Sequence, residues 1–276
     1  MPNTTPATTQ PTHPPVIIIG MHRSGTSLLT RLLEKLGLFV GHNKDDNHEA
    51  IFFLLINNRM MSCSGGGWRR PEHFERLIKN EKHLNDLKKY ALSKLASSEF
   101  ESYSGGHFDQ FREMPGPWGW KDPRNTYTLP VWLSIFHDAK IINIVRHGVD
   151  VAHSLHERYK RRHGQTSVNS IPSTRQNPVA TLEGSFALWE KYVTTGHSRV
   201  TAQGERALEI KYEDFLNNPA ELLEIITEFC SISNNKNQIH NLVDGINTNR
   251  AYAYRNNPEL VKFEKRVADR LGALGY

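Results

Sequence analysis

Short apolar runs alternate with helical patterns along the chain. Val16–Ile19 is β-branched and wholly apolar, which is typical of a strand buried on both faces of a parallel sheet. From Thr26 to Leu36 leucines recur at helical spacing, and Gly37 is a suitable helix end. The pattern predicts that the chain opens as a strand, a glycine-containing loop and a helix.

Two further strand–helix units are predicted. The apolar run Lys140–Val145 is followed by a helix-compatible stretch from Val149 to Tyr159, and the strand candidate Ala207–Ile210 precedes a helix from about Pro219 to Cys230. Strands that alternate with helices favour parallel βαβ units. The predicted fold class is therefore α/β, a three-layer sandwich with a central parallel sheet.

Two polar segments interrupt the alternation. Ser62–Trp118 contains a helical middle from Pro71 to Leu95, and Lys160–Thr181 has the composition of a loop. Insertions on an α/β scaffold commonly lie at the ligand end of the sheet and shape access to it. Substrate contact and surface decoration both remain open for these insertions, at about residues 62–118 and 160–181.

Composition narrows the class of protein. Cys63 and Cys230 are the only cysteines, too few for a disulfide scaffold, and they suit a reducing compartment. No run approaches the ~18 apolar residues of a transmembrane helix, and the Thr/Pro-rich residues 1–15 lack the regions of a secretory signal. We expect a disordered leader over 1–15, a single domain over 16–276 and a cytoplasmic location.

The charge of the chain is mildly basic. Its net charge of +5 and pI of about 9.1 suit an anionic ligand. The basic residues are spread through the sequence, without the continuous stripe or aromatic platforms that favour nucleic acid. We therefore expect a small-molecule or glycan partner and no nucleic acid, and no pattern indicates an oligomeric state.

The loop after the first predicted strand has the sequence GMHRSGTS. A helix N-terminus offers unpaired N–H groups and a partial positive charge to phosphate oxygens. The glycine spacing matches the triphosphate-binding loop G-x-x-x-x-G-K-S/T, but Thr26 replaces the lysine that a kinase needs. The cation of this P-loop-like strand–loop–helix is instead Arg23.

With its flanking strand and helix, this loop resembles the 5′-phosphosulfate loop of the sulfotransferase family, whose donor is 3′-phosphoadenosine 5′-phosphosulfate (PAPS). Arg146 at a strand end, with Ser154 eight residues on, resembles the second motif of the family. Lys211–Phe215 resembles a third. The resemblance implies that the 3′-phosphate binds Arg146 and Ser154, that adenine contacts Tyr212, and that the loop binds the donor through His22, Arg23, Ser24, Gly25, Thr26 and Ser27.

The resemblance also implies where the chemistry takes place. Sulfuryl transfer needs a base for the acceptor proton, cations at the transferred group and in-line placement. Arg23 is one cation, and Lys121 in the Lys-Asp-Pro segment is the other. The product would be 3′,5′-ADP. No metal is expected to be required, because the leaving group is a nucleotide phosphate.

The catalytic base is expected in a polar cluster that follows the loop. Its candidates are Asp45, Asp46, His48 and Glu49. Glu49 leads because the following residues complete the Glu-x-x-Phe-Phe pattern of glycosaminoglycan-type members, and His48 is second because histidine serves as the base in another branch.

The acceptor would be a hydroxyl or amine, and similarity to glycan-modifying members favours a carbohydrate or glycoconjugate. The basic run Tyr159–His163 is typical of a solvated helix end, but it could also attract an acidic acceptor such as a uronic-acid glycan. Two other functions compete: a P-loop kinase-like phosphotransferase that needs Mg²⁺ and ATP, and a non-catalytic nucleotide-binding module. The missing lysine and the Arg146–Ser154 pair argue against the kinase.

Overall fold

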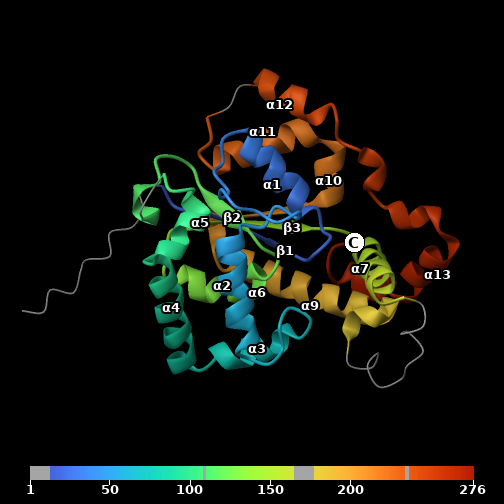
Figure 1. The fold of residues 1–276 in the computed structure, drawn as a ribbon. Helices are drawn as coiled ribbons and strands as arrows, with labels where there is room; N and C mark the ends of the chain where they lie inside the picture. Colours follow the sequence, from blue (N-terminus) through green and yellow to red (C-terminus); the bar gives the residue numbers. More distant parts are fainter. Residues whose placement is uncertain (1–12, 108–109, 165–176, 234–235) are drawn as a thin grey trace, which may run out of the picture.

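A parallel sheet of four strands forms the middle layer of the protein (Figure 1). The computed structural model describes residues 13–107, 110–164, 177–233 and 236–276. In spatial order the strands are β2 (Gly119–Lys121), β1 (Val16–Gly20), β3 (Lys140–Val145) and β4 (Ala207–Lys211). The central strand β1 places Ile17 beside Trp120 on one side and Ile141 on the other.

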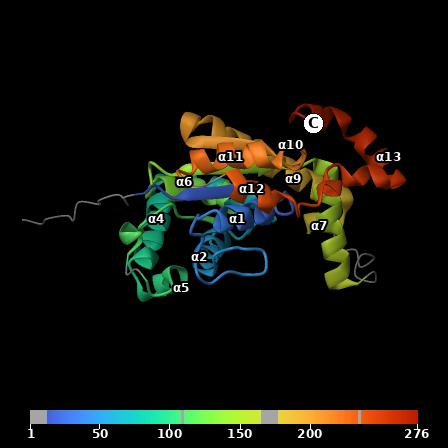
Figure 2. The ribbon, with the colours of Figure 1, turned by 90° about the horizontal axis from the view of Figure 1, so that it is seen from above.

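Helices cover both faces of the sheet, which confirms the predicted α/β class (Figures 1 and 2). One face carries α1 (Thr26–Lys35), α10 (Tyr212–Asn217), α11 (Pro219–Phe229) and α12 (Lys236–Val243). The opposite side carries α2 (Ile51–Ser62), α3 (Pro71–Ile78), α4 (Glu81–Leu95), α5 (Glu101–Ser104), α6 (Asn125–Leu133), α7 (Gly148–His163), α9 (Leu182–Thr201), α13 (Pro258–Arg266) and α14 (Ala268–Gly272).

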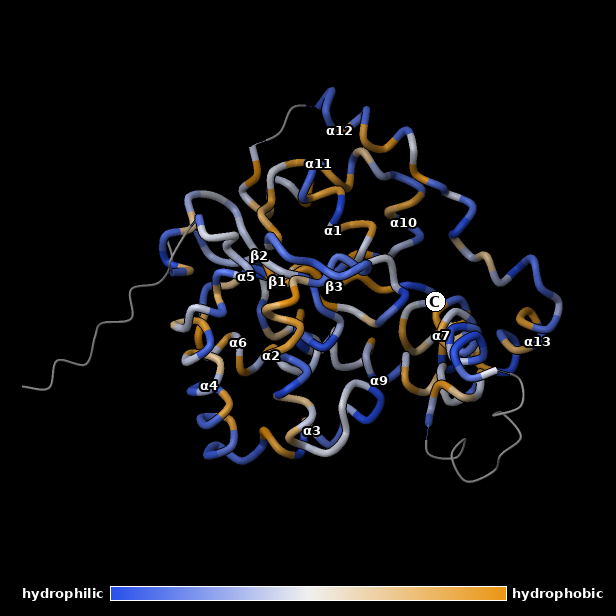
Figure 3. The backbone as a smooth tube through the Cα atoms, in the orientation of Figure 1, coloured by the Kyte–Doolittle hydropathy of each residue, from blue (hydrophilic) through white to orange (hydrophobic). Residues whose placement is uncertain are grey.

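Side chains of the two central strands divide between two hydrophobic clusters. Val16 and Ile18 of β1 face the cluster with α1 and α11, whereas Ile17 and Ile19 face the larger cluster with α2, α6 and α9. This alternation follows from the two-residue period of a strand. In Figure 3 the hydrophobic positions accordingly gather around β1 and along α2 and α6.

Aromatic rings join α2 to the edge strand β2. The ring of Phe53 stacks on Trp120 at a centroid distance of 3.9 Å and an interplanar angle of 4°. Trp132 of α6 packs edge-on against both rings. Because α2 begins two residues after Glu49 and β2 ends at Lys121, this stack fixes the backbone beside two of the predicted site residues.

The structure corrects and extends the predicted element boundaries. The segment predicted as a loop from Lys160 begins instead as the last turn of α7, which continues to His163. Its polar residues are compatible with a helix because Arg161, Arg162 and His163 are exposed. Residues 165–176 of that segment, and 1–12 of the predicted leader, lie outside the described residues. None of the described helices is both long enough and apolar enough to cross a membrane.

Candidate active site

The loop after β1 has a backbone that only glycine adopts easily at two of its positions. Gly20 has a φ of 130° and Gly25 a φ of 96°. A Cβ atom at Gly25 would lie 2.3 Å from the ring of Tyr212, so the loop and this tyrosine are packed in direct contact. No side chain caps the N-terminus of α1. The first turn of α1 therefore presents uncapped amide groups beside the loop.

The second predicted half of the site lies against this loop. The guanidinium Nε of Arg23 donates to Ser154 Oγ at 2.8 Å, across 131 positions of sequence. Arg146 donates to the Arg23 carbonyl at 3.4 Å, and its guanidinium carbon lies 5.0 Å from the centroid of the Tyr212 ring. The structure thus brings together four residues that the sequence motifs placed far apart.

A cleft of about 230 Å³ opens between these groups. Six cations and two carboxylates are among its lining residues, which are His22, Arg23, Gly25, Thr26, Ser27, Leu28, Arg31, Asp46, Asn47, Glu49, Lys121, Pro123, Arg146, Arg158, Tyr212 and Arg250. We call it the nucleotide cleft. Its excess of positive charge suits a highly anionic ligand.

Two predicted residues lie beside the nucleotide cleft instead of in its wall. Ser154 does not line the cleft, but its Oγ accepts a hydrogen bond from Arg23, which does. Ser24 is fully buried, and its Oγ has no hydrogen-bond partner among the described residues; the same holds for Arg146 Nε. Buried polar atoms are normally hydrogen-bonded. The orphaned guanidinium nitrogen of Arg146 therefore fits the predicted phosphate ligand.

Lys121 and Glu49 meet at the inner end of the nucleotide cleft. Lys121 Nζ lies 3.2 Å from Glu49 Oε1 and 3.4 Å from Ser27 Oγ, and it donates to the Asn47 carbonyl at 2.5 Å. The other oxygen of Glu49 lies 3.1 Å from Arg124 Nη1. The side chains of Lys121 and Glu49 are only 1% and 5% exposed.

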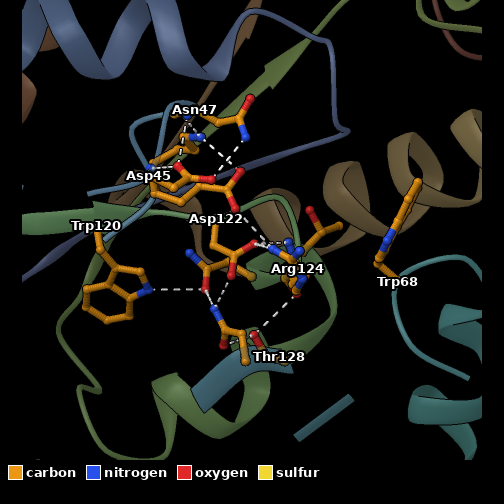
Figure 4. A network of polar contacts seen from close by, with 12 residues as sticks. Asp45, Asn47, Trp68, Trp120, Asp122, Arg124 and Thr128 are labelled. Atoms are coloured by element: carbon orange, nitrogen blue, oxygen red, sulfur yellow. Dashed lines mark hydrogen bonds and ion pairs between the residues drawn. The ribbon is translucent and has the colours of Figure 1, made fainter. Parts of the chain in front are cut away.

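Burial acts on both members of this pair. It raises the pKa of Glu49 and lowers the pKa of Lys121, because a charged form is less stable away from water. Arg124 offsets part of the effect on Glu49 and is itself ion-paired with Asp122 at 2.7 Å. Figure 4 shows Asp122 and Arg124 within this polar network. A carboxylate with a raised pKa is a stronger proton acceptor.

The other three candidates for the base have different surroundings. His48 lies toward α1, where its Nε2 is 2.5 Å from Glu34 Oε2. Asp45 accepts the backbone N–H groups of Glu49 at 2.8 Å and Asn47 at 2.9 Å, which fixes the turn before α2 (Figure 4). Asp46 lines the nucleotide cleft without contacting Lys121. Of the four candidates, only Glu49 pairs with Lys121.

A second cleft of about 230 Å³ adjoins the first. The two share His22, Asn47, Glu49 and Arg158, and we call the second one the acceptor-side cleft. Its other lining residues are Asp45, Leu54, Asn58, Trp68, Arg69, Arg124, Leu155, Tyr159, Arg162, His163 and Val179. Both inserted segments predicted from the sequence contribute to this wall.

Several residues of the two clefts were missed by the sequence analysis. Arg250 lines the nucleotide cleft, and its carbonyl accepts from Arg146 Nη2 at 3.0 Å. Arg31, Arg69 and Arg158 also line the clefts. Arg31 and Arg158 belong to predicted helices, α1 and α7. Each helix follows a motif of the site, and this nearness to the motifs could have identified the two arginines as candidates. Arg69 lies in a turn and Arg250 ends a three-residue 3₁₀ helix, and neither segment has a sequence pattern that points to a site.

Comparisons with known proteins give one family match and a similar fold. A model described as "Sulfotransferase family" matches residues 14–236. The fold is similar to a sulfotransferase from Alicyclobacillus acidocaldarius, with a TM-score of 0.51, 16% identity and coverage of 95% of this chain and 94% of that one. The sulfotransferase domain of the Synechococcus PCC 7002 olefin synthase gives a TM-score of 0.47, 19% identity and coverage of 87% and 83%. Sulfotransferase STF9 from Mycobacterium avium gives a TM-score of 0.49 and 14% identity, with coverage of 93% of this chain and 77% of that one. A search of curated proteins finds no match.

Proposed function

The chain belongs to the sulfotransferase family, whose enzymes use PAPS as donor, and from this premise we propose that it sulfates a hydroxyl or amine of a carbohydrate or glycoconjugate. One observation carries the assignment of the site. Arg23, Arg146 and Lys121 line a single cleft whose inner end also holds Glu49. The nucleotide cleft thereby combines cations for a donor with a carboxylate for the acceptor.

We assign the donor contacts residue by residue. The amides at the start of α1, with Arg23, Thr26 and Ser27, hold the 5′ side of the donor, since anions bind at uncapped helix N-termini. Arg146 recognises the 3′-phosphate, Ser154 holds the Arg23 guanidinium next to this site, and Tyr212 contacts the adenine. PAPS supplies a sulfuryl group on a phosphate oxygen, so its transfer releases 3′,5′-ADP.

Glu49 and Lys121 have separate tasks in the proposed transfer. Glu49 accepts the proton of the acceptor hydroxyl, and burial favours this by raising its pKa. Lys121 stabilises the negative charge that develops on the transferred and leaving oxygens, with Arg23 as the second cation. The proton moves to Glu49 as the acceptor oxygen forms its bond to sulfur and the bond between sulfur and phosphate oxygen breaks.

The nucleotide preference tests this assignment directly. We expect 3′,5′-ADP to bind tightly in the presence of EDTA, because arginine and lysine side chains supply the positive charge of the nucleotide cleft. We expect ATP to bind weakly, because Thr26 replaces the lysine of a triphosphate loop. Isothermal titration calorimetry with both nucleotides measures the difference. Binding that disappears on chelation, or a preference for ATP, would contradict the proposed function.

Arg146 tests the second half of the nucleotide cleft. Arg146→Ala should weaken 3′,5′-ADP binding by about 2–4 kcal/mol, as expected when a charge-assisted phosphate contact is lost. Arg266→Ala is the matched control, because its ion pair with Glu183 is exposed. Since Arg146 also pairs with Asp150 at 3.2 Å, the thermal unfolding of each variant is compared as well. A folded Arg146→Ala protein with an unchanged dissociation constant would show that the 3′-phosphate binds elsewhere.

A further inference from the structure

We propose that the acceptor carries an anionic group, a carboxylate or a sulfate ester, which binds Arg69, Arg158 and Arg162 while the reacting hydroxyl lies at Glu49. This inference rests on the proposed function, because it takes Glu49 as the base. All four residues line the acceptor-side cleft. Arg158 and Arg162 come from α7, whereas Arg69 comes from the first inserted segment.

The three arginines differ from the other charged groups of the acceptor-side cleft. Arg124 is neutralised by Asp122 and Glu49. By contrast, among the residues that the structure describes, no carboxylate forms an ion pair with Arg69, Arg158 or Arg162. The buried Nε of Arg69 likewise has no hydrogen-bond partner there. The wall of the cleft therefore holds three guanidinium groups that have no carboxylate within ion-pair distance among the described residues, although Glu49 and Asp45 lie close enough to raise the pKa of Arg158.

Two of these arginines lie at a spacing where like charges repel. Arg158 and Arg162 are four positions apart on α7, a spacing at which like charges destabilise a helix. Burial and then Arg162 lower the pKa of both Arg69 and Arg158, the direction expected where like charges lie close together, and Glu49 and Asp45 offset part of the effect on Arg158. A bound anion would relieve the repulsion and satisfy the open donors.

The other basic residues at the end of α7 show which positions of this helix line the acceptor-side cleft. Lys160 pairs with Glu157 at 2.9 Å, and Arg161 is exposed and absent from the walls of both clefts. Of the basic run considered in the sequence, Arg162 and His163 line the acceptor-side cleft. Arg162 and His163 are exposed like Arg161, and they differ from it in that they line the cleft.

The aromatic residues of the acceptor-side cleft favour a sugar as the rest of the acceptor. Trp68 and Tyr159 line the acceptor-side cleft, and the Arg69 guanidinium carbon lies 4.8 Å from the centroid of the Trp68 ring. Figure 4 places Trp68 on the side of the network where Arg124 lies. Flat apolar rings beside charged donors would contact the carbon face of an acidic sugar.

The test measures binding of three oligosaccharides by calorimetry with saturating 3′,5′-ADP. Tetragalacturonate carries carboxylates, a sulfated chondroitin tetrasaccharide carries sulfate esters and carboxylates, and maltotetraose is neutral. We compare the wild type with Arg69→Gln/Arg162→Gln, which leaves Arg158 in place because it also lines the nucleotide cleft. Arg161→Gln is the control for the Arg162 half of this variant, since it removes one positive charge from the same helix at a residue that lines neither cleft.

At least one acidic probe should bind the wild type more tightly than maltotetraose. The double variant should weaken that binding by about tenfold or more, as expected for charge-assisted hydrogen bonds, with 3′,5′-ADP affinity unchanged and Arg161→Gln within about twofold of the wild type. Acidic probes that bind no better than maltotetraose, or an equal loss in Arg161→Gln, would overturn the inference. Failure of the wild type to bind 3′,5′-ADP would instead contradict the proposed function.

Discussion

Glu49→Gln should lower turnover by about 10²- to 10⁴-fold, the usual contribution of a general base, with little change in 3′,5′-ADP affinity. The amide has the shape of the carboxylate but cannot accept the acceptor proton. Burial raises the pKa of Glu49, and the deprotonated form is the active one, so wild-type turnover should fall as the pH falls through that pKa. Initial rates across pH, together with calorimetry, measure both effects.

Three neighbouring variants serve as controls for Glu49. Turnover should be retained in His48→Ala, because His48 contacts Glu34 instead of Lys121. It should also be retained in Asp46→Asn, because Glu49 is the candidate that pairs with Lys121. Asp45→Asn should have an intermediate effect, since Asp45 accepts the backbone N–H of Glu49. If Glu49→Gln keeps near-normal turnover while His48→Ala abolishes it, the base is the histidine. If all four variants stay active, the base lies in another segment.

Lys121→Ala should lower turnover by about 10²- to 10³-fold, as expected when a preorganised charge is removed from a developing oxyanion. Lys121 is almost fully buried between Ser27 and Glu49, so no exposed cation can move easily into its place. Glu49 retains Arg124 as a partner in this variant. Turnover should therefore fall much more than 3′,5′-ADP affinity, which the same calorimetric titration measures.

The control for Lys121 is Lys191→Ala, which removes a lysine from an exposed ion pair with Glu72. Its turnover should match the wild type. Thermal unfolding of Lys121→Ala separates loss of chemistry from loss of folded protein, because Lys121 is also a core residue. Equal losses of turnover and of nucleotide affinity would make Lys121 a binding residue and not a catalytic one.

The elements that the sequence predicted correctly are those with a strong local pattern. The β-branched run of β1 and the regularly spaced leucines of α1 can each be recognised from a few consecutive residues. The edge strand β2 was missed because it has only three residues, Gly119–Lys121. Helix α2 was missed because apolar and polar residues are mixed on its two faces, with Leu55 60% exposed and Asn57 buried, so the helix lacks the amphipathic period that prediction uses.

The site was predictable only where a family motif covered it. Resemblance placed Arg23 and Ser154 in one site, although nothing local in the sequence brings them within 2.8 Å. Arg69 and Arg250 lie in segments whose position depends on the whole fold, so no spacing rule could have assigned them. Glu49 was selected among four polar residues, and its contact with Lys121 depends on the pairing of β2 with β1.

The stacked rings of Phe53 and Trp120 have a consequence for how rigidly Glu49 and Lys121 are held together. One ring stands four residues after Glu49 and the other directly before Lys121, so the two charged groups are carried by a single block of aromatic packing. Neither ring lines either cleft, so this packing sets the separation of the Glu49 carboxylate and the Lys121 ammonium from outside the site.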